Sequence, residues 1–308
     1  MTNRPVIIIA GPTACGKTSL SLMLANRLGA EIISADSRQI YRGLDIGTAK
    51  PEPRELSTIK HHLLDVLEPN QPYSAAAFVC RAREVMSQLD RQGIPYVIVG
   101  GSGLYLKALI EGLSPIPPAD PAIRQELSDL AQQKGVPALH QMLDRVDPLA
   151  ASRIKQNDRD RLVRALEVYR LSGIPLSQWQ RGKREKDHRA YQLYVLNRSR
   201  PDLYGRIERR VDQMIARGLL QETRELLERG LSAQSPGLRT VGYREAMEFV
   251  EGRISREEAV RLIKQNTRRY AKRQLTWFRG MPQSAWIDLG EGEHWEKVIG
   301  VISPETGP

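Results

Sequence analysis

The residues with the clearest chemical meaning form a glycine-rich loop near the start of the chain, at positions 11–18. Their order matches the pattern G-x-x-x-x-G-K-[ST], which binds phosphate chains. The glycines let the backbone curve so that its N–H groups face an anion, the lysine adds a positive charge, and the final hydroxyl can bind Mg²⁺. Thr18 is therefore the predicted metal ligand, and Mg²⁺ is the expected cofactor. The residues predicted to bind the phosphates are Gly11, Pro12, Thr13, Ala14, Cys15, Gly16, Lys17 and Thr18.

The segments on either side of this loop predict the strand and the helix that such a loop requires. Val6–Ala10 is a largely β-branched run without polar alternation, as in a strand that is buried on both faces. Leucines recur every four residues through Ser19–Leu28, and Gly29 supplies a helix stop. The sequence therefore predicts a strand, a loop and a helix in that order.

The same order recurs twice further along the chain. One strand is predicted at 31–35 and ends in Asp36, and another is predicted at 96–99 and ends in a Gly-Gly-Ser-Gly run before a helix from Leu104. Such repetition favours a parallel sheet, whose ligands gather beyond the carboxyl ends of the strands. The predicted fold is therefore α/β, a P-loop NTPase-like parallel sheet flanked by helices, with the three loops at one site.

The middle of the chain predicts an inserted all-helical domain. Residues 114–118 read as an extended proline-rich linker, and the residues that follow have helical rather than strand periodicity. Sheet-like sequence returns at 191–196, and a last strand is predicted at 285–289. The predicted domains are a catalytic core at 1–113 and 191–308 and a helical insertion at 114–190.

Composition and charge narrow the class of partner. The 308 residues hold 46 Lys and Arg against 36 Asp and Glu, and the pI near 9.7 favours a polyanionic partner. The two cysteines, Cys15 and Cys80, fit neither a disulfide framework nor a structural zinc site. The apolar opening at Val6–Ala10 is too short to span a bilayer, and no export signal is evident. We therefore expect a cytoplasmic protein with no membrane role.

Six further motifs follow the glycine-rich loop in a fixed order. They are Asp36-Ser37-Arg38-Gln39, Asp45–Pro51, Gly100–Tyr105, Asn157–Glu167, Arg239–Arg244 and Lys272–Arg279. The loop alone would favour a nucleotide or small-molecule kinase, because most loops of this kind bind ATP or GTP. The ordered series from Pro5 to Arg279 instead resembles the tRNA dimethylallyltransferases, also called tRNA isopentenyltransferases.

This resemblance implies a prenyl transfer to RNA. Members of the family move a dimethylallyl group from dimethylallyl diphosphate to the exocyclic N6 amine of adenine 37, beside the anticodon of tRNA, and release diphosphate. The implied partners are therefore dimethylallyl diphosphate and a tRNA anticodon stem-loop, and the loop at 11–18 would bind diphosphate. An allylic C–O bond breaks when the charge on the leaving diphosphate is stabilised, which Lys17 and a metal on Thr18 can do.

The resemblance also implies which residues act. Asp36 is the implied general base for the amine, Ser102 assists it at a position that is commonly threonine in the family, and Lys17 is the third catalytic residue. Asp36 could alternatively cap the following turn or bind the metal, and Ser102 could be only a turn residue. The implied tRNA-binding residues are Asp36, Ser37, Arg38, Gln39, Ser102, Arg124, Asp160, Arg161, Leu162, Val163, Arg164, Arg239, Thr240, Val241, Gly242, Tyr243, Arg244, Lys272, Arg273, Gln274, Leu275, Thr276, Trp277, Phe278 and Arg279.

The segment Arg256–Arg279 concentrates positive charge, with eight basic residues and two acidic ones. As a helix it would carry Arg261, Lys264, Arg268 and Lys272 on one face, and Ile263, Tyr270 and Trp277 at seven-residue intervals on another. We predict that the basic face meets RNA phosphates, and that Tyr270 and Trp277 pack in the core rather than stack on bases. A merely solvated charged helix is the alternative.

Three functions remain open at this point: the RNA prenyltransferase, a P-loop small-molecule or nucleotide kinase, and a non-catalytic nucleoside-triphosphate-binding RNA protein. Prenyl transfer to free adenylate is a closer chemical alternative, but it leaves the basic surface unexplained. His61-His62 receives no metal assignment, because adjacent strand residues point apart. The chain lacks the cysteines of the zinc finger in larger nuclear and mitochondrial members, which favours the bacterial type, and a monomer is expected.

Overall fold

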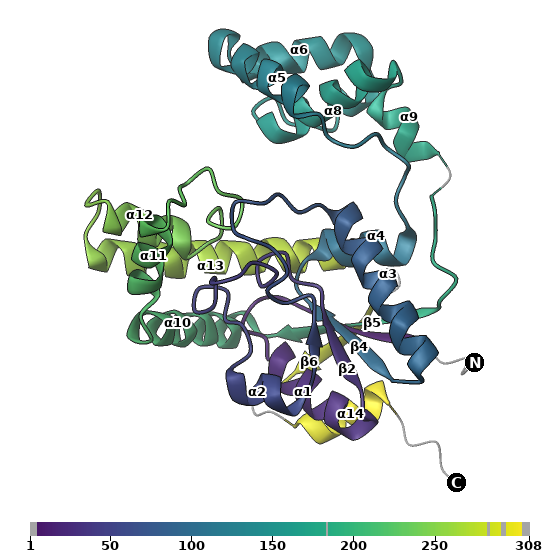
Figure 1. Ribbon diagram of the computed structural model, residues 1–308, viewed down its shortest axis with the longest axis vertical. Coiled ribbons are helices and arrows are strands. Elements are labelled where there is room, and N and C mark those ends of the chain that lie inside the picture. The colour runs from purple at the N-terminus through teal and green to yellow at the C-terminus, as the bar shows by residue number, and fades with distance from the viewer. Residues whose placement is uncertain (1–4, 183, 282–283, 291–293, 304–308) are drawn as a thin grey trace. The chain divides into compact units, whose positions relative to one another are not determined.

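Six parallel strands form the sheet that carries the site. The computed structural model describes residues 5–182, 184–281, 284–290 and 294–303 (Figure 1). All pairings between neighbouring strands are parallel, so the predicted α/β class is confirmed. In sheet order the strands are β3 (His61–His62), β2 (Glu31–Ser34), β4 (Tyr96–Gly100), β1 (Val6–Ala10), β5 (Tyr191–Arg198) and β6 (Ser284–Leu289).

The chain divides into two compact units, one made of Met1–Ile110 with His188–Pro308 and the other of Glu111–Asp187. In the first unit, the helices around the sheet are α1 (Lys17–Leu28), α2 (Pro53–Thr58), α3 (Ala75–Gln92), α4 (Gly103–Glu111), α10 (Arg200–Ala216), α11 (Leu219–Glu228), α12 (Tyr243–Val250), α13 (Arg256–Arg279) and α14 (Trp295–Ile302). The second unit consists of α5 (Pro121–Lys134), α6 (Val136–Val146), α7 (Pro148–Ala151), α8 (Arg159–Ser172) and α9 (Leu176–Arg181). Across the described residues, no helix combines the length and apolar character needed to cross a membrane.

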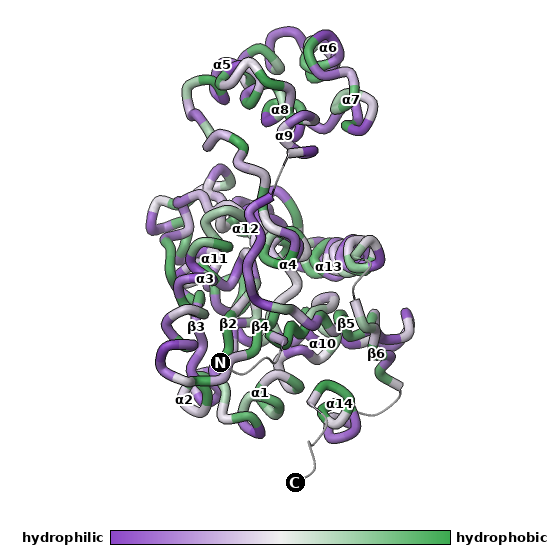
Figure 2. The backbone as a smooth tube through the Cα atoms, turned by 90° about the vertical axis from the view of Figure 1, so that its right-hand side faces the viewer, coloured by the Kyte–Doolittle hydropathy of each residue, from purple (hydrophilic) through white to green (hydrophobic). Residues whose placement is uncertain are grey.

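Burial explains why the strands are so apolar. β1 lies between β4 and β5, and its Ile8 and Ile9 side chains are fully buried. Ile9 shares one hydrophobic cluster with Leu20 of α1 and Ile299 of α14, which lie far apart in sequence. Figure 2 shows hydrophobic residues gathered in β2 and β4 as well. A strand covered on both faces has no solvated side, so it lacks polar alternation.

Glycines in left-handed conformations cap both ends of helix α1. Gly16 has a φ of +105° at the start of the helix, and Gly29 has a φ of +59° at its end. Residues with a Cβ rarely adopt these angles, which glycine adopts without strain. The predicted stop at Gly29 is therefore confirmed, and α1 begins at Lys17, inside the phosphate-binding motif.

Helix α13 has the predicted bounds, but its buried face differs from the predicted one. Ile263 is buried, whereas Tyr270 is only half-buried and Trp277 is 38% exposed. Residues seven apart lag by about 20° per step on a helix of 3.6 residues per turn, so Trp277 lies at the edge of the face. The prediction that Trp277 packs in the core is therefore wrong. The buried residues of α13 are Ala259, Ile263, Ala271, Gln274 and Phe278.

Candidate active site and RNA-binding residues

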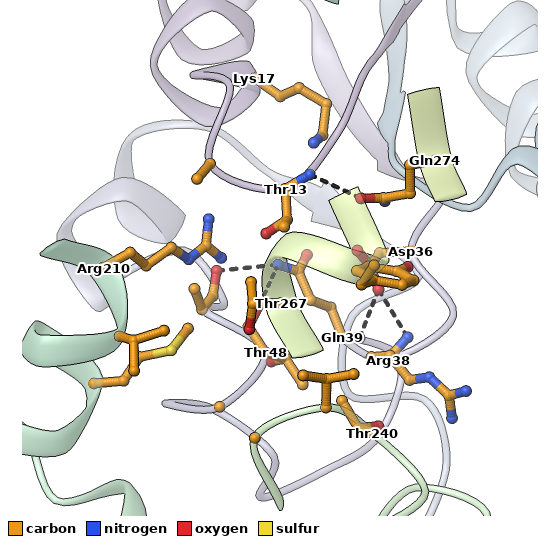
Figure 3. A pocket seen from close by; sticks show the side chains of 18 of the residues that line it. Thr13, Lys17, Asp36, Arg38, Gln39, Thr48, Arg210, Thr240, Thr267 and Gln274 are labelled. Atoms are coloured by element: carbon orange, nitrogen blue, oxygen red, sulfur yellow. Dashed lines mark hydrogen bonds between the residues drawn. The ribbon is translucent and has the colours of Figure 1, made fainter. Parts of the chain in front are cut away.

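A cavity of about 580 Å³ lies at the carboxyl edge of the sheet, within the first unit (Figure 3). Its walls are the glycine-rich loop after β1, the turn after β2, the end of β4, the loop at 47–49, helix α10, the segment 239–244 and helix α13. The loops that follow parallel strands meet at this edge, as expected for such sheets. The cavity therefore gathers segments from both halves of the chain into one site.

Two arginines bind backbone carbonyls of the glycine-rich loop. Arg206 of α10 donates through Nε to the carbonyl of Ala14 at 2.9 Å, and Arg198 at the end of β5 donates through Nε to the carbonyl of Cys15 at 2.9 Å. A peptide N–H points opposite to the C=O of the same peptide, so the bond from Arg198 to the Cys15 carbonyl turns the N–H of Gly16 the other way, where it can face an anion. The N–H of Cys15 instead donates to the carbonyl of Pro12 at 3.4 Å. Neither arginine was among the residues predicted from the sequence.

Lys17 lies at the first turn of α1 and reaches back over the loop (Figure 3). Its Nζ donates to the carbonyls of Gly11 at 3.1 Å and Pro12 at 2.8 Å. Thr18, the next residue, is exposed and lines the cavity. Five of the eight predicted phosphate-binding residues line the cavity, namely Thr13, Ala14, Gly16, Lys17 and Thr18.

Asp36 lies at the end of β2 and uses one carboxylate oxygen to order the following turn. Its Oδ1 accepts hydrogen bonds from the backbone N–H groups of Arg38 at 2.8 Å and Gln39 at 3.4 Å. Oδ2 makes no hydrogen bond to any described residue, and Asp36 lines the cavity. The turn-capping alternative is therefore true of Oδ1, and the other oxygen remains available as an acceptor.

Ser102 adjoins this turn without lining the cavity. Its Oγ accepts a hydrogen bond from the backbone N–H of Ser37 at 2.9 Å, which leaves its own proton for donation. The two loops can approach because Gly100 has no side chain: a Cβ there would lie 2.1 Å from the carbonyl oxygen of Ala35. Ser102 thus supports the residue next to Asp36.

Gln274 of α13 joins two of the loops through its carboxamide. Its Oε1 accepts from the backbone N–H of Thr13 at 2.9 Å, and its Nε2 donates to the carbonyl of Gly101 at 2.9 Å. A Cβ at Gly101 would lie 2.4 Å from Nε2, so a larger residue there would displace this carboxamide from its two partners. Gln274 was predicted to bind tRNA, yet both ends of its buried amide are occupied by the protein.

Positive charge dominates the cavity. Its lining includes one carboxylate, Asp36, against eight cationic side chains: Lys17, Arg38, Arg206, Arg209, Arg210, Arg239, Arg244 and Arg273. Burial lowers the pKa of Arg210 from its usual value, while the negative charge of Asp36 acts to raise it. A concave wall of cations suits a diphosphate together with RNA phosphates. The spacing of Arg206, Arg209 and Arg210 along one face of α10 could have revealed this wall from the sequence.

Comparison with known proteins identifies the family. A family model described as IPP transferase matches residues 39–281. The chain belongs to the IPP transferase family. A tRNA dimethylallyltransferase of Syntrophobacter fumaroxidans is 47% identical over 289 residues, which cover 93% of this chain and 84% of that protein. One from Carboxydothermus hydrogenoformans is 45% identical over 304 residues, covering 98% and 97%. The resemblance identified in the sequence is confirmed.

Solved structures of the family share the fold. The tRNA isopentenylpyrophosphate transferase of Bacillus halodurans is 39% identical with a TM-score of 0.70, over 97% of this chain and 94% of that one. A eukaryotic dimethylallyltransferase, whose crystallographic snapshots were taken as it acted on tRNA, gives a TM-score of 0.79 at 26% identity, over 94% and 75%. The P-loop type of parallel sheet is thus the fold of the IPP transferase family.

The predicted tRNA-binding residues of the first unit differ in what they can touch. Those that line the cavity are Asp36, Arg38, Gln39, Arg239, Thr240, Val241, Gly242, Arg244, Arg273 and Gln274. Tyr243 and Phe278 are fully buried, so their side chains support the IPP transferase fold from within. Lys272, Thr276 and Trp277 line a second cavity, of about 530 Å³, that also includes Arg273. The remaining predicted residues line neither of these cavities and are not fully buried; they are Ser37, Ser102, Leu275 and Arg279.

Three of the four basic residues on the predicted RNA face of α13 are paired with carboxylates. Arg261 pairs with Glu258 at 2.6 Å within the helix. Lys264 and Arg268 pair with Asp212 and Glu208 of α10, each at 2.6 Å, and the two helices lie side by side (Figure 1). These pairs reduce the net charge that this face offers to RNA, and they show that part of its basic pattern serves helix packing.

In the helical unit, two predicted tRNA-binding arginines converge on one carboxylate. Glu167 is fully buried, and its side chain accepts from Arg124 at 2.8 Å and from Arg164 at 2.6 Å. Burial acts to raise the pKa of Glu167. The hydrogen bonds from these arginines and from the N–H of Asp120 together lower it by more, so the net shift is downward. Of the remaining predicted residues, Asp160 and Arg161 are exposed, whereas Leu162 and Val163 are buried.

Proposed function

We propose that the protein transfers a dimethylallyl group from dimethylallyl diphosphate to the N6 amine of adenine 37 in tRNA and releases diphosphate. The observation that carries this proposal is the cavity, which is lined by the phosphate-binding loop, by Asp36 with its free oxygen and by eight cationic side chains. Relatives that cover nearly the whole chain are tRNA dimethylallyltransferases. The family and the geometry therefore support the same reaction.

The glycine-rich loop would bind the diphosphate as a leaving group. When the allylic C–O bond breaks, its electron pair stays on the diphosphate, and Lys17, Arg206 and Arg210 supply positive charge against that developing anion. A Mg²⁺ ion fits here because it keeps several waters and needs few protein ligands, so the exposed hydroxyl of Thr18 and diphosphate oxygens suffice. When bound, Mg²⁺ would add further positive charge against the diphosphate.

Asp36 would serve as the general base. The N6 lone pair forms the new C–N bond to the allylic carbon, and one N6 proton passes to Oδ2 of Asp36. The Oδ1 hydrogen bonds to Arg38 and Gln39 hold the carboxylate in place during this transfer. Ser102 would assist by bracing the turn through Ser37.

The first unit would bind the RNA through phosphate and base contacts. Adenine 37 must leave the stacked anticodon loop to reach the cavity, at a cost of a few kcal/mol. The exposed arginines Arg239, Arg244 and Arg273 would hold nearby phosphates, and Arg124, Asp160, Arg161 and Arg164 would contact the RNA from the helical unit. Because the substrate is a tRNA, we expect action in the cytoplasm. The expected monomer is tested by mass measurement in solution.

The decisive test is a transfer assay. The purified protein is incubated with Mg²⁺, dimethylallyl diphosphate and an anticodon stem-loop that has adenine after the anticodon, and the RNA is then weighed by mass spectrometry. A five-carbon gain that requires this adenine supports the proposal. An unchanged RNA mass across a panel of competent stem-loops, together with ATP consumption in a parallel assay, would instead support a kinase.

A further inference from the structure

Gln39 holds its side-chain carboxamide in one orientation. Its Nε2 donates to two backbone carbonyls, that of Thr48 at 3.2 Å and that of Ala49 at 3.0 Å. A carboxamide nitrogen carries two hydrogens, and only that end of the group can satisfy two carbonyls. Oε1 therefore faces away from these carbonyls, and it makes no hydrogen bond to any described residue. Figure 3 shows the carboxamide among the side chains that line the cavity.

The loop that supplies these two carbonyls is itself held in place. The carboxylate of Glu222 accepts from three consecutive backbone N–H groups, those of Asp45 at 3.2 Å, Ile46 at 2.9 Å and Gly47 at 3.3 Å. The hydroxyl of Tyr243, a fully buried residue, donates to Glu222 at 2.5 Å and accepts from the N–H of Gly47 at 3.2 Å. The orientation of Gln39 is therefore built into the fold.

Strong acceptors are scarce in this cavity. Its side-chain carboxylate and amide groups are those of Asp36, Gln39, Gln213 and Gln274. Oε1 of Gln274 is occupied by the N–H of Thr13, and Gln213 is exposed to solvent. Asp36 and Gln39 remain, three residues apart on one turn, and the backbone N–H of Gln39 donates to Asp36 at 3.4 Å. Two acceptors from the same turn thus face a cavity whose other charged groups are all cations.

We propose that Oε1 of Gln39 accepts one hydrogen of the substrate amine while Asp36 removes the other. The inference rests on the proposed function, since it assigns a second contact to the same N6 group. An exocyclic amine carries two hydrogens: one passes to Asp36 as the C–N bond forms, and the other stays on N6. Holding that second hydrogen fixes the plane of the amine and aims its lone pair at the allylic carbon. Gln39 also selects for a donor at this position of the base.

A double-mutant cycle tests this contact. Binding to the wild-type protein and to Gln39→Leu is measured with two stem-loops that differ only in having adenine or unsubstituted purine after the anticodon. If Oε1 accepts from the amine, Gln39→Leu narrows the preference for adenine over purine by roughly 2- to 12-fold, the range of one neutral hydrogen bond. Gln221→Leu, at an exposed residue outside the cavity, is the matched control and should keep the wild-type preference.

The outcomes separate this contact from the overall function. If Gln39→Leu weakens both RNAs by the same factor, Gln39 only supports the loop at 48–49 and the hydrogen bond is refuted. If that variant does not fold, Gln39→Met, which also lacks an acceptor amide, takes its place in the cycle. A wild-type protein that adds no five-carbon group to the adenine stem-loop refutes the proposed function, and the binding cycle does not depend on that assay.

Discussion

Replacing Arg210 by methionine should impair the use of dimethylallyl diphosphate more than the binding of tRNA. Arg210 lies in the wall of α10 that lines the cavity with the glycine-rich loop (Figure 3). Its guanidinium forms no hydrogen bond or ion pair with any described residue, although burial lowers its pKa from the usual value. Arginine nonetheless stays protonated, so the fold keeps a poorly solvated cation that a diphosphate can neutralise. Methionine keeps the approximate length of the side chain and removes the charge.

The size of the effect follows from the strength of a charged hydrogen bond. One such bond contributes about 1.5–3 kcal/mol, which corresponds to about 10- to 150-fold in kcat/KM for dimethylallyl diphosphate. The dissociation constant for the stem-loop should change far less. Removing a half-buried, unpaired charge should also leave the melting temperature of the ligand-free protein unchanged or higher, because binding groups are often held at a cost in stability.

Steady-state transfer kinetics, a binding assay for the stem-loop and thermal unfolding give these three quantities. Arg217→Met is the matched control, because Arg217 ends the same helix but is exposed and pairs with Glu52 outside the cavity. The reasoning is refuted if both variants lose kcat/KM equally, or if Arg210→Met loses stem-loop affinity while its kcat/KM for dimethylallyl diphosphate is retained.

Four further changes test other parts of the protein. Asp36→Asn keeps an Oδ1 acceptor for the turn but removes the base, so the transfer rate should fall at least ~100-fold with tRNA affinity retained; unchanged turnover would exclude Asp36 as the base. Neutralising Lys272 and Arg273 together should reduce the slope of log affinity against log salt by about 2, and an unaltered slope would place the RNA elsewhere. Tyr243→Phe should cost about 1–3 kcal/mol in unfolding free energy, because it removes the hydrogen bonds of the hydroxyl to the charged Glu222 and to Gly47; an unchanged denaturation midpoint would argue against this role. Because the pKa of Glu167 is lowered in the folded state, its contribution to stability is present above its unfolded pKa and is lost as pH falls through its folded pKa. Glu167→Gln should therefore reduce the loss of unfolding free energy as the pH is lowered. An unchanged acid dependence of the unfolding free energy would contradict a lowered pKa.

The sequence predicted the parts of the site that depend on local pattern. The apolar run at Val6–Ala10, the motif at 11–18 and the acid at Asp36 all lie where a parallel sheet puts its ligand edge. These predictions succeeded because strand burial and loop chemistry are local properties. The same reasoning did not identify α2, α3, α12 or α14. Segments as short as α2, α12 and α14 are defined mainly by what they pack against, whereas the 18-residue α3 buries Phe78, Ala82, Met86 and Leu89 at helical spacing and could have been predicted.

The supporting contacts could not be predicted because they join residues that are distant in sequence. Gln274 lies 261 residues from Thr13, its hydrogen-bond partner. The basic spacing of α13 resembled a phosphate-binding face, yet Lys264 and Arg268 pair with acids on α10. A charge pattern in one helix does not reveal the partner helix, so only the three-dimensional arrangement separates charges that pack from charges that bind.

The bond between Thr13 and Gln274 also bears on how the protein is made. The phosphate-binding loop leaves the ribosome early, but the amide that ties it to Gly101 belongs to α13 and is synthesised only after most of the chain. Until α13 is in place, the loop at 11–18 and the Gly-Gly turn after β4 lack the hydrogen bonds from Gln274 that connect them, and the cavity lacks one wall. We therefore expect that a chain that stops before α13 is inactive even where strands β1 to β5 have paired.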